Sequence, residues 1–552
     1  MITLQMKILS SLEKCFYDDA LEDKCEKKNF IMFRNERLSF QVAYRADHPD
    51  INIERWCSVR CGGSLAQYTT VRMVSNVLNM YPTYNVNPGG EFIKTEPGAY
   101  PDMIRPLIYP DAVSLPNGQT HALWLDVELP EGFEAGEYDI SVEIWNEDER
   151  LAGVTGSVCV IDEELPKMDL IHTEWFYIDC IANHYRCKVF SERHWTLIEK
   201  FMRTAVRNGI NMILTPVFTP ALDTYIGGER TTTQLVDVEL IKKGKYVFGF
   251  EKLHRWIDLC LKCGVEYFEI PHFFTQWGAK AAPKIIVKVN GKNTKYFGWH
   301  TDSLGEEYEV FLSQFIPALI AEFKGRRLDK KCFFHVSDEP KLEMLEHYTR
   351  CKNLIQRYLG DDYPIIDALS DLEFYSAGAL KKPAPNTRNA LDFVKAGVNG
   401  LWVYYCGGGK AGVSDRSISM PSWRTRILGV QLYYYNIEGF LHWGYNFYNS
   451  CQSRNVLDPF GYPDGGYFTP SGDCFLVYPG TDGEAWESLR LNALREAMDD
   501  IRALKLYEEK FGRAAAEELV LKDTDGILNF THYPTNIDYL IHLREQIAKS
   551  LI

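Results

Sequence analysis

The chain has 552 residues, a formal net charge of −15 and 13% aromatic residues, including 12 Trp and 32 Tyr. The acidic balance excludes partners that reward a basic surface, so neither a nucleic acid nor an anionic membrane is expected. The length allows two domains with large cores, and the aromatic content suits a sugar-stacking site as well as it suits a large apolar core.

The first part of the chain, residues 1–165, is predicted to be an all-β domain. It consists of short alternating runs separated by turns, which is the pattern of a β-sandwich. The clearest runs are Leu38–Tyr44, Ile51–Trp56, His121–Leu129, Glu137–Trp145 and Val154–Ile161. The acidic segment Glu163–Lys167 is the expected linker, because alternating strand and helix signals begin beyond it.

The second part, residues 166–510, is predicted to be a (β/α)8 barrel of the TIM type, because eight short apolar runs are each followed by helical or loop sequence. The predicted strands are His172–Ile178, Met212–Pro216, Tyr267–Ile270, Cys332–Val336, Pro364–Ala368, Leu401–Tyr405, Gly439–Trp443 and Phe475–Tyr478. Only between the fifth and sixth strands is the helical signal poor. Residues 511–552 are predicted to form a helical tail that packs on the barrel or the sandwich.

A long insertion follows the third predicted strand of the barrel. Its Asn290-Gly291 pair lies between alternating residues, which predicts a β-hairpin. Such a hairpin could wall a pocket and bring Trp299 or His300 near a ligand, or it could be a solvated decoration of the loop.

The strongest candidate for a catalytic centre is the acidic pair Asp338 and Glu339, which directly follows the buried strand Cys332–Val336. In a (β/α)8 barrel the C-terminal ends of the strands carry the catalytic groups. Pro340 is expected to hold Glu339 in extended geometry, ahead of a helix over Lys341–Leu359.

Adjacent carboxylates in a partly dry site disfavour double ionisation. One pKa is then raised, and a carboxylic acid that can protonate a leaving group becomes available. This is the chemistry of a glycosidase. A structural alternative stays open at this point, in which Asp338 caps the following helix and Glu339 is solvated beside the positive end of that helix.

Aromatic and polar side chains gather at the ends of the predicted strands and are candidate sugar contacts, because hydroxyl-rich ligands need stacking planes and a few fixed donors and acceptors. Each residue taken singly is also explained as a packed aromatic or a satisfied polar group. Their shared position on one face of the barrel favours binding. The candidates are Trp175, Tyr177, His272, Asp367, Tyr404, Trp443 and Asn446, with Gln276, Trp277 and Tyr405 beside them.

Other chemistries have no support in the sequence. It contains neither an HExxH nor a GxSxG motif, and Cys260 and Cys263 form a single CxxC pair without a second one. The 14 cysteines are scattered through apolar stretches, which is typical of reduced thiols. The N-terminus lacks the pattern of a signal peptide, so a cytoplasmic location is expected. The oligomeric state stays open.

The chain resembles glycoside hydrolase family 123 and its uncharacterised bacterial relatives over most of its length. The most specific part of the likeness is the acidic pair in FHVSDEP, followed at a distance by GFLHWG. The matching stretches are GAYPDMIRPL (Gly98–Leu107), LPEGFEAGEYDISVEIW (Leu129–Trp145), FHVSDEP (Phe334–Pro340), GLWVYYC (Gly400–Cys406), RTRILGVQLYYYNIEGFLHWGYNFY (Arg424–Tyr448), and GDCFLVYPG with SLRLNALREAMDD (within Gly472–Asp500).

The resemblance implies a β-sandwich followed by a (β/α)8 catalytic domain that acts as a retaining exo-β-N-acetylgalactosaminidase. Members of the family use the substrate's own acetamido oxygen as the nucleophile. Carried onto this sequence, Glu339 is the general acid and then the general base, and Asp338 orients the acetamido group and stabilises the oxazolinium-like intermediate. The resemblance implies no metal and no organic cofactor, and a small glycoside or an oligosaccharide as the substrate.

Two alternatives remain from the sequence. The first is a glycosidase of the same fold that acts on another sugar, either β-GlcNAc or a glycoside without an acetamido group. The second is a glycan-binding protein without catalytic activity. Inhibition by a thiazoline mimic of the intermediate separates the enzymic alternatives, and binding without turnover marks the last one.

Overall fold

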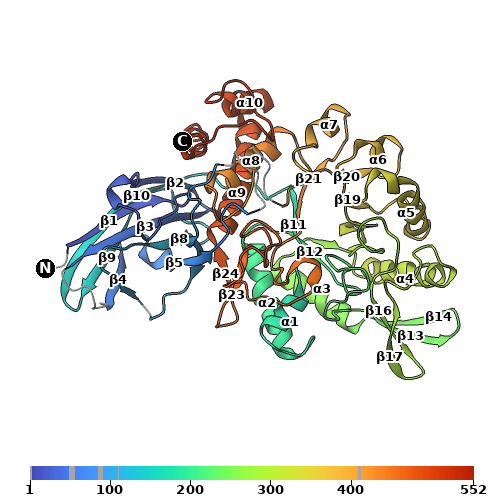
Figure 1. Cartoon of the computed structure of the whole chain (residues 1–552). Helices are drawn as coiled ribbons and strands as arrows, with labels where there is room; N and C mark the ends of the chain where they lie inside the picture. Colours follow the sequence, from blue (N-terminus) through green and yellow to red (C-terminus); the bar gives the residue numbers. More distant parts are fainter. Residues whose placement is uncertain (1–2, 49–55, 85–90, 110, 408–411) are drawn as a thin grey trace.

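The computed structural model describes residues 3–48, 56–84, 91–109, 111–407 and 412–552. In Figure 1 the N-terminal strands lie at one side of the molecule, and the parallel strands with their surrounding helices lie at the other. No helix in these described ranges is both long enough and apolar enough to cross a membrane.

Two sheets make up the N-terminal side, and their inward side chains share one apolar cluster. Strand β9 shows the cause, because Ile140, Val142 and Ile144 are buried and alternate with more accessible neighbours. The first sheet has the order β1 (Thr3–Ser10), β3 (Arg37–Asp47), β8 (Thr120–Glu128), β5 (Thr69–Asn79), β6 (Gly98–Arg105), β24 (Ala485–Ser488), β23 (Val477–Pro479). The second has the order β2 (Asn29–Phe33), β10 (Glu149–Ile161), β9 (Gly136–Asn146), β4 (Trp56–Gly62), β7 (Ala112–Ser114).

The last two strands of the first sheet come from the far end of the chain. Strand β24 pairs antiparallel with β6, and β23 pairs antiparallel with β24. The prediction that Phe475–Tyr478 is the eighth barrel strand is therefore wrong. This segment pairs with β24 because a tight turn, in which the N–H of Gly483 donates to the carbonyl of Gly480, folds the chain back on itself. The predicted run Ile51–Trp56 lies outside the described residues except for Trp56, which begins β4.

Six strands form a parallel sheet, and each of them corresponds to one of the predicted runs. All neighbouring pairs in it are parallel. Its order is β18 (Cys332–Phe333), β15 (Tyr267–Glu269), β12 (Met212–Leu214), β11 (Ile171–Glu174), β22 (Gly439–His442), β21 (Trp402–Tyr404).

Two further strands, β19 (Ile366–Ala368) and β20 (Lys382–Ala384), pair in parallel with each other. Parallel bridges join Phe334 to Ile365 at one end and Asn386 to Tyr404 at the other. These contacts link β18 to β19 and β20 to β21, so eight parallel strands follow one another in chain order. Strand β20 was not expected, because its KPA sequence contains a proline that disfavours a strand interior.

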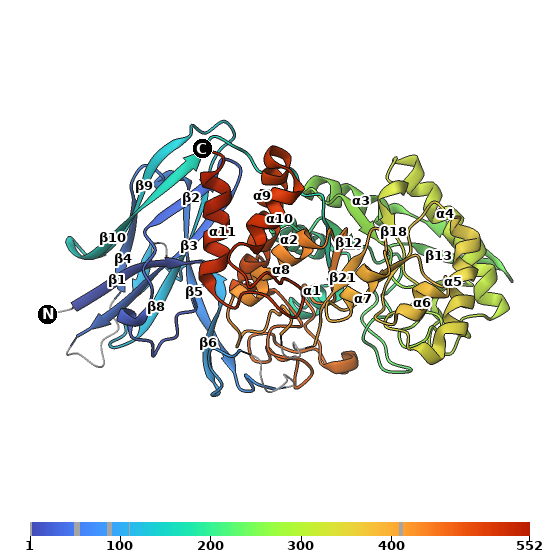
Figure 2. The same ribbon diagram turned by 90° about the horizontal axis from the view of Figure 1, so that it is seen from above.

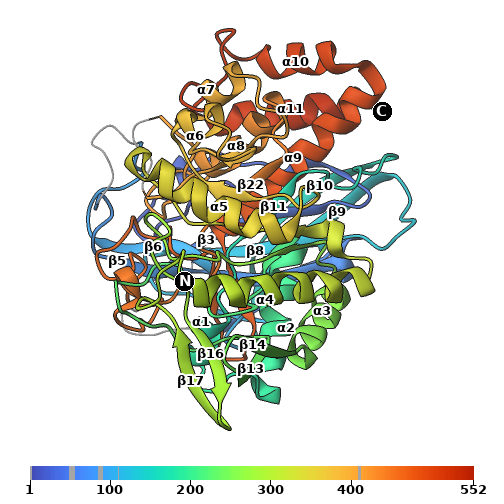
Figure 3. The same ribbon diagram turned by 90° about the vertical axis from the view of Figure 1, so that its right-hand side faces the viewer.

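Helices surround the parallel strands (Figure 3). In α2 the predicted stripe of Leu197, Phe201 and Ala205 is buried, and the hydroxyl of Ser191 caps the first turn by accepting from the N–H of His194. The helices are α1 (Ile178–His184), α2 (Glu192–Arg207), α3 (Glu251–Cys263), α4 (Glu306–Gly325), α5 (Leu345–Leu359), α6 (Leu372–Ser376), α7 (Ala390–Lys395), α8 (Trp423–Tyr434) and α9 (Leu489–Phe511).

The predicted hairpin is confirmed. Asn290 and Gly291 have left-handed φ angles of 49° and 79° and join β16 (Ile285–Val289) to β17 (Lys292–Phe297). With β13 (Asp237–Lys242) and β14 (Lys245–Gly249) they form a four-stranded sheet that projects at the bottom of Figure 3. The ring of His300 is 3.1 Å from the carbonyl of Tyr296 within this excursion.

The last helices, α10 (Arg513–Leu521) and α11 (Ile537–Lys549), pack on both parts of the molecule (Figure 2). Helix α11 contacts β2 on one side and α8 and α9 on the other. Its Arg544 Nη2 is 2.6 Å from Glu36 Oε1, an ion pair that fastens the end of the chain to the N-terminal sheets.

Candidate active site

The acidic pair lies just beyond the end of β18, at a sharp turn of the backbone. Glu339 has a φ of 41°, which is left-handed, so the prediction of extended geometry before Pro340 is wrong. The turn is held from both sides, because the N–H of Glu339 donates to the carbonyl of Ala368 at 3.2 Å and the carbonyl of Asp338 accepts from Trp277 at 3.3 Å. It lets two adjacent carboxylates face one cavity, which a straight strand cannot do.

The helix after the pair begins later than predicted. A 3-10 helix spans Leu342–Met344, and α5 begins at Leu345. Neither helix has a side-chain hydrogen bond at its N-cap, which is Lys341 in one and Met344 in the other. The alternative that Asp338 serves as a helix cap is therefore wrong.

Both carboxylates line a cavity of about 300 Å³ at the C-terminal ends of the parallel strands. We call this cavity the Asp338 pocket. A larger hollow of about 660 Å³ lies elsewhere, beside α9, and is bordered by arginines whose partners include Asp499 and Glu128. The Asp338 pocket is lined by Trp175, Tyr177, Leu222, Asp223, Gln276, Trp277, Asp338, Glu339, Ala368, Tyr404, Cys406, Gly407, Leu441, Trp443, Phe468, Thr469 and Asp473.

The two carboxylates have different surroundings. Asp338 is half-buried, whereas Glu339 is exposed to the cavity. Removal from water, followed by the neighbouring charges of Glu339 and Asp367, raises the pKa of Asp338 well above its usual range. The hydroxyl of Tyr404 donates to Oε1 of Glu339 at 2.5 Å. The pair can therefore hold a proton that an ordinary aspartate would already have lost.

The aromatic walls of the pocket are fixed by hydrogen bonds to buried acids. The indole N–H of Trp443 donates to Asp473 Oδ2 at 3.2 Å, and that of Trp175 donates to Glu269 Oε1 at 2.7 Å. Asp473 also accepts from the N–H of Gly407 at 3.2 Å. These bonds hold the rings as rigid planes, the arrangement that sugar stacking needs.

Tyr177 carries an unpaired polar group into the pocket wall. Its ring lies under the guanidinium of Arg230, 4.4 Å from the ring centre, and Arg230 is paired with Asp179 at 2.8 Å. The hydroxyl is buried and has no hydrogen-bond partner among the described residues. Such a group is costly unless a ligand supplies the partner.

Three of the predicted sugar contacts lie behind the pocket wall and do not line it. Asn446 is fully buried, and its amide bonds both the N–H and the carbonyl of Tyr177, at 2.8 and 3.0 Å. It therefore positions Tyr177 and has no free group for a sugar. Asp367 and His272 are also buried, and they belong to a cluster beside the segment that leads to the turn at Glu339.

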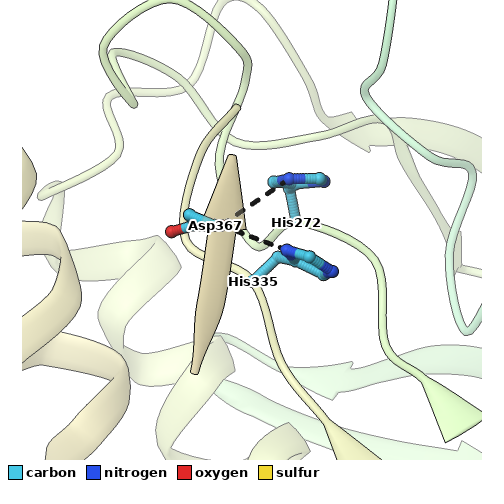
Figure 4. A group of neighbouring side chains, drawn as sticks. All are labelled: His272, His335 and Asp367. Atoms are coloured by element: carbon cyan, nitrogen blue, oxygen red, sulfur yellow. Dashed lines mark hydrogen bonds and ion pairs between the residues drawn. The ribbon is translucent and has the colours of Figure 1, made fainter. Parts of the chain in front are cut away.

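Figure 4 shows this cluster, which consists of His272, His335 and Asp367. Their nearest nitrogen and oxygen atoms lie within 4.8 Å of one another, close enough to suit a metal ion. However, His335 already contacts Asp367 at 3.2 Å and Glu269 at 2.7 Å, and Asp367 accepts the hydroxyl of Tyr348 at 2.6 Å. His335 and Asp367 are thus occupied by partners, whereas both ring nitrogens of His272 are buried without a hydrogen-bond partner among the described residues.

The two histidines of the cluster hold opposite charge states. The carboxylates of Asp367 and Glu269 outweigh burial and raise the pKa of His335 to about 9. Burial, with the charge of His335, lowers the pKa of His272 well below its usual value, so His272 is neutral. Its ring stacks on that of His335 with the centres 4.3 Å apart. The segment before the turn at Glu339 therefore packs on a charged and fully buried cluster.

Several pocket residues were not among the predicted contacts. Asp223 has a left-handed φ of 45°, and burial raises its pKa to about 6. Phe468 packs against Trp443 with ring centres 5.6 Å apart. Asp473 lies inside GDCFLVYPG, one of the stretches that carry the family resemblance. Its position there is the feature of the sequence that could have marked it as a pocket residue.

Comparison with known proteins identifies relatives of this arrangement. The model of the glycoside hydrolase 123 catalytic domain matches residues 175–507. A family 123 glycoside hydrolase from Clostridium perfringens, described in a study of glycolipid glycan hydrolysis, superposes with a TM-score of 0.74 at 15% identity, over 100% of this chain and 98% of that one. A family 39 glycoside hydrolase from Bacteroides cellulosilyticus matches with a TM-score of 0.35 at 11% identity, over 88% and 82% of the two chains. The search of curated proteins gave no match.

Proposed function

The chain belongs to glycoside hydrolase family 123 and is a glycosidase, and from this premise we propose that it removes terminal β-linked N-acetylgalactosamine with retention, by substrate-assisted catalysis. The observation that carries the proposal is the turn at Glu339, which presents two adjacent carboxylates to one pocket. Consecutive residues cannot flank a sugar as acid and opposed nucleophile, so the nucleophile must come from elsewhere.

The remaining pocket carboxylates are poor nucleophiles. Asp473 is bound to Trp443, Gly407 and the ring of His442, each at 3.2 Å. Backbone hydrogen bonds from Gln452 and Ser453 stabilise the charge of Asp223, and its Oδ2 atom is buried. The acetamido oxygen of the substrate fills the missing role.

In the proposed reaction Glu339 donates its proton to the glycosidic oxygen as the bond to the anomeric carbon breaks. The acetamido oxygen attacks the anomeric carbon from the opposite face and forms an oxazolinium ion. The pair shares one proton, and Asp338 is the anion when that proton lies on Glu339. In this state Asp338 accepts the acetamido N–H and balances the positive charge of the oxazolinium ion. Water then attacks the same carbon while Glu339 takes its proton. The bond between that carbon and the acetamido oxygen breaks, the acetamido group is restored, and the configuration is retained.

The pocket suits a single terminal sugar. A volume of about 300 Å³ lies at the low end for ligand sites. Trp175 and Trp443 supply flat apolar surface, and the unpaired hydroxyl of Tyr177 supplies a polar contact. We propose that Tyr404 acts on the substrate indirectly, because its hydroxyl orients the carboxylate of Glu339.

We propose that the eight parallel strands form a (β/α)8 barrel and that the two N-terminal sheets form a β-sandwich. Two observations support this. The parallel strands neighbour one another in chain order through β18–β19 and β20–β21, and a shared apolar cluster joins both N-terminal sheets.

The test is release of nitrophenol from the aryl β-GalNAc glycoside by the purified protein, beside the β-GlcNAc analogue and a Glu339→Gln control. We expect turnover of GalNAc and inhibition by the thiazoline mimic of the intermediate. On a substrate with a poor leaving group, Glu339→Gln removes most turnover, because no proton reaches the departing oxygen. Turnover that the thiazoline leaves untouched would contradict acetamido participation, and turnover of GlcNAc alone would correct the sugar.

A further inference from the structure

Trp277 is the exposed aromatic residue of the described pocket lining. It is 39% exposed, whereas the other aromatic side chains of the lining are buried or half-buried. Its indole has neither a hydrogen bond nor a ring contact with any residue that the structure describes. Trp443 across the pocket differs, because its indole is bonded to Asp473 and packed against Phe468.

The backbone holds this exposed ring in a strained position. Trp277, Gly278 and Ala279 have consecutive left-handed φ angles of 60°, 106° and 56°. A substitution at Gly278 would be strained at this φ angle and would also displace the side chain of Met344, because a Cβ there would lie 2.5 Å from its sulfur. Non-glycine residues in this region cost on the order of 1–3 kcal/mol each and persist where the surroundings enforce them, which is common at ligand sites.

Hydrogen bonds join the segment Phe274–Trp277 to the segment Val336–Asp338, which leads to the acidic pair. The N–H of Phe274 donates to the carbonyl of Val336 at 3.1 Å, and the N–H of Trp277 donates to that of Asp338 at 3.3 Å. Between them the hydroxyl of Ser337 donates to the carbonyl of Thr275 at 2.9 Å. The backbone that carries the indole is thus fixed relative to the backbone that carries the acidic pair.

We propose that Trp277 forms the subsite for the leaving group, and that the first sugar on the aglycone side of the scissile bond stacks on its indole. The inference rests on the proposed function, because it takes Glu339 as the acid. The acid must touch the glycosidic oxygen, so the leaving group lies beside Glu339 and toward solvent. Glu339 and Trp277 are the exposed carboxylate and the exposed ring of the lining, and the hydrogen bond from the N–H of Trp277 to the carbonyl of Asp338 ties their two segments together.

The chemical class that fits is a sugar with a flat C–H face, as in an oligosaccharide or a glycan chain. An exposed indole gains from covering such a face, and its free N–H can reach a hydroxyl. The stacked sugar would also cover Glu339 and exclude water from the acid during proton transfer. A lone terminal sugar would leave both residues uncovered.

The experiment compares two substrates in Trp277→Ala. The β-GalNAc fluoride has a leaving group too small to stack and needs little help from an acid, whereas a disaccharide with terminal β-GalNAc carries a leaving sugar. We expect kcat/KM for the disaccharide to fall by about 10- to 50-fold and that for the fluoride to change less than about 2-fold. Trp277→Phe should recover part of the loss, because it restores a smaller ring.

Trp56→Ala is the matched control, since Trp56 is 43% exposed and belongs to the N-terminal sheet strand β4. It should leave both substrates unchanged. An equal loss on both substrates in Trp277→Ala would show a structural role, and no loss on the disaccharide would show that the ring does not touch the leaving group; either result overturns the inference.

Failure of the proposed function gives a different pattern. If the wild-type protein cleaves neither GalNAc substrate, the sugar is wrong, and the same comparison is made with the fluoride and disaccharide of the sugar that an aryl-glycoside panel identifies. A protein that cleaves no glycoside of the panel overturns both proposals.

Discussion

The hydroxyl of Tyr404 donates a 2.5 Å hydrogen bond to Oε1 of Glu339. Tyr404 is the last residue of β21, whereas Glu339 follows β18, at the opposite end of the six-stranded sheet. A residue from a distant strand therefore orients the exposed carboxylate. Burial and the charge of Glu339 raise the pKa of Tyr404 well above its usual value, so the phenol stays a donor. One oxygen of Glu339 is thereby fixed, and the other is free to face the glycosidic bond.

Tyr404→Phe should lower kcat about 10-fold on substrates with poor leaving groups, because the carboxylate that delivers the proton loses its fixed orientation. Activated aryl glycosides, which need less proton transfer, should be affected less. Steady-state kinetics on a disaccharide and on a dinitrophenyl glycoside measure the difference. Equal losses on both would show that Tyr404 acts on something other than the acid.

Asp338→Asn should reduce turnover by about 10²- to 10³-fold on every substrate, activated ones included. The amide keeps the volume of the side chain but cannot balance the charge of the oxazolinium ion. Glu339→Gln on the same activated glycoside is the comparison, and it should retain far more activity. If Asp338→Asn stays active on the activated substrate, the assignment of the intermediate's stabiliser fails.

Tyr177→Phe separates binding from stability. The buried hydroxyl lacks a partner in the free protein, so its removal should leave the free energy of unfolding unchanged or raise it by about 1 kcal/mol. The sugar loses a hydrogen bond at the same time, so KM should rise about 10-fold. Thermal unfolding and kinetics test the two halves.

Tyr405→Phe is the matched control, because the hydroxyl of Tyr405 is also buried without a partner in the described structure, yet Tyr405 does not line the pocket. It should show the stability effect with KM unchanged. A KM that rises in both variants, or in neither, would remove Tyr177 from the sugar contacts.

The strands are predictable where they are short apolar runs that end in a loop, as Cys332–Val336 is. Strands are not predictable where pairing with segments far along the chain determines whether they form and which sheet they join. Lys382–Ala384 forms a strand despite Pro383, because β19 and Tyr404 lie on either side of it. Val477–Pro479 has the composition of a barrel strand, but pairing through β24 places it in another sheet.

The site shows the same division. A strand end followed by two acids reveals Asp338 and Glu339, because the chemistry is local in sequence. Sequence cannot show which polar side chains are already satisfied, and Asn446 and Asp367 are satisfied by Tyr177 and by His335. Nor does it show that a turn leaves the ring of Trp277 in the open.

His335 makes the stability depend on pH in a defined direction. Asp367 and Glu269 raise its folded pKa to about 9, above the ordinary value of 6.5. The charged ring therefore contributes stability that is fully present below pH 6.5 and is lost as the pH rises through about 9. The loss should be on the order of 3 kcal/mol. Denaturant unfolding between pH 6 and 10 measures it.

His335→Gln should remove this slope and lower the free energy of unfolding at pH 6 by about 3 to 5 kcal/mol, because it leaves Glu269 and Asp367 buried without a cation. His194→Gln is the control. His194 is equally buried, but burial lowers its pKa, so it does not titrate near pH 9 as His335 does. Its loss should cost its two hydrogen bonds, about 1 kcal/mol each, with no change around pH 9. If the free energy of unfolding of His335→Gln still falls with pH as it does in the wild-type protein, another group titrates. The conclusion that His335 is charged would then be wrong.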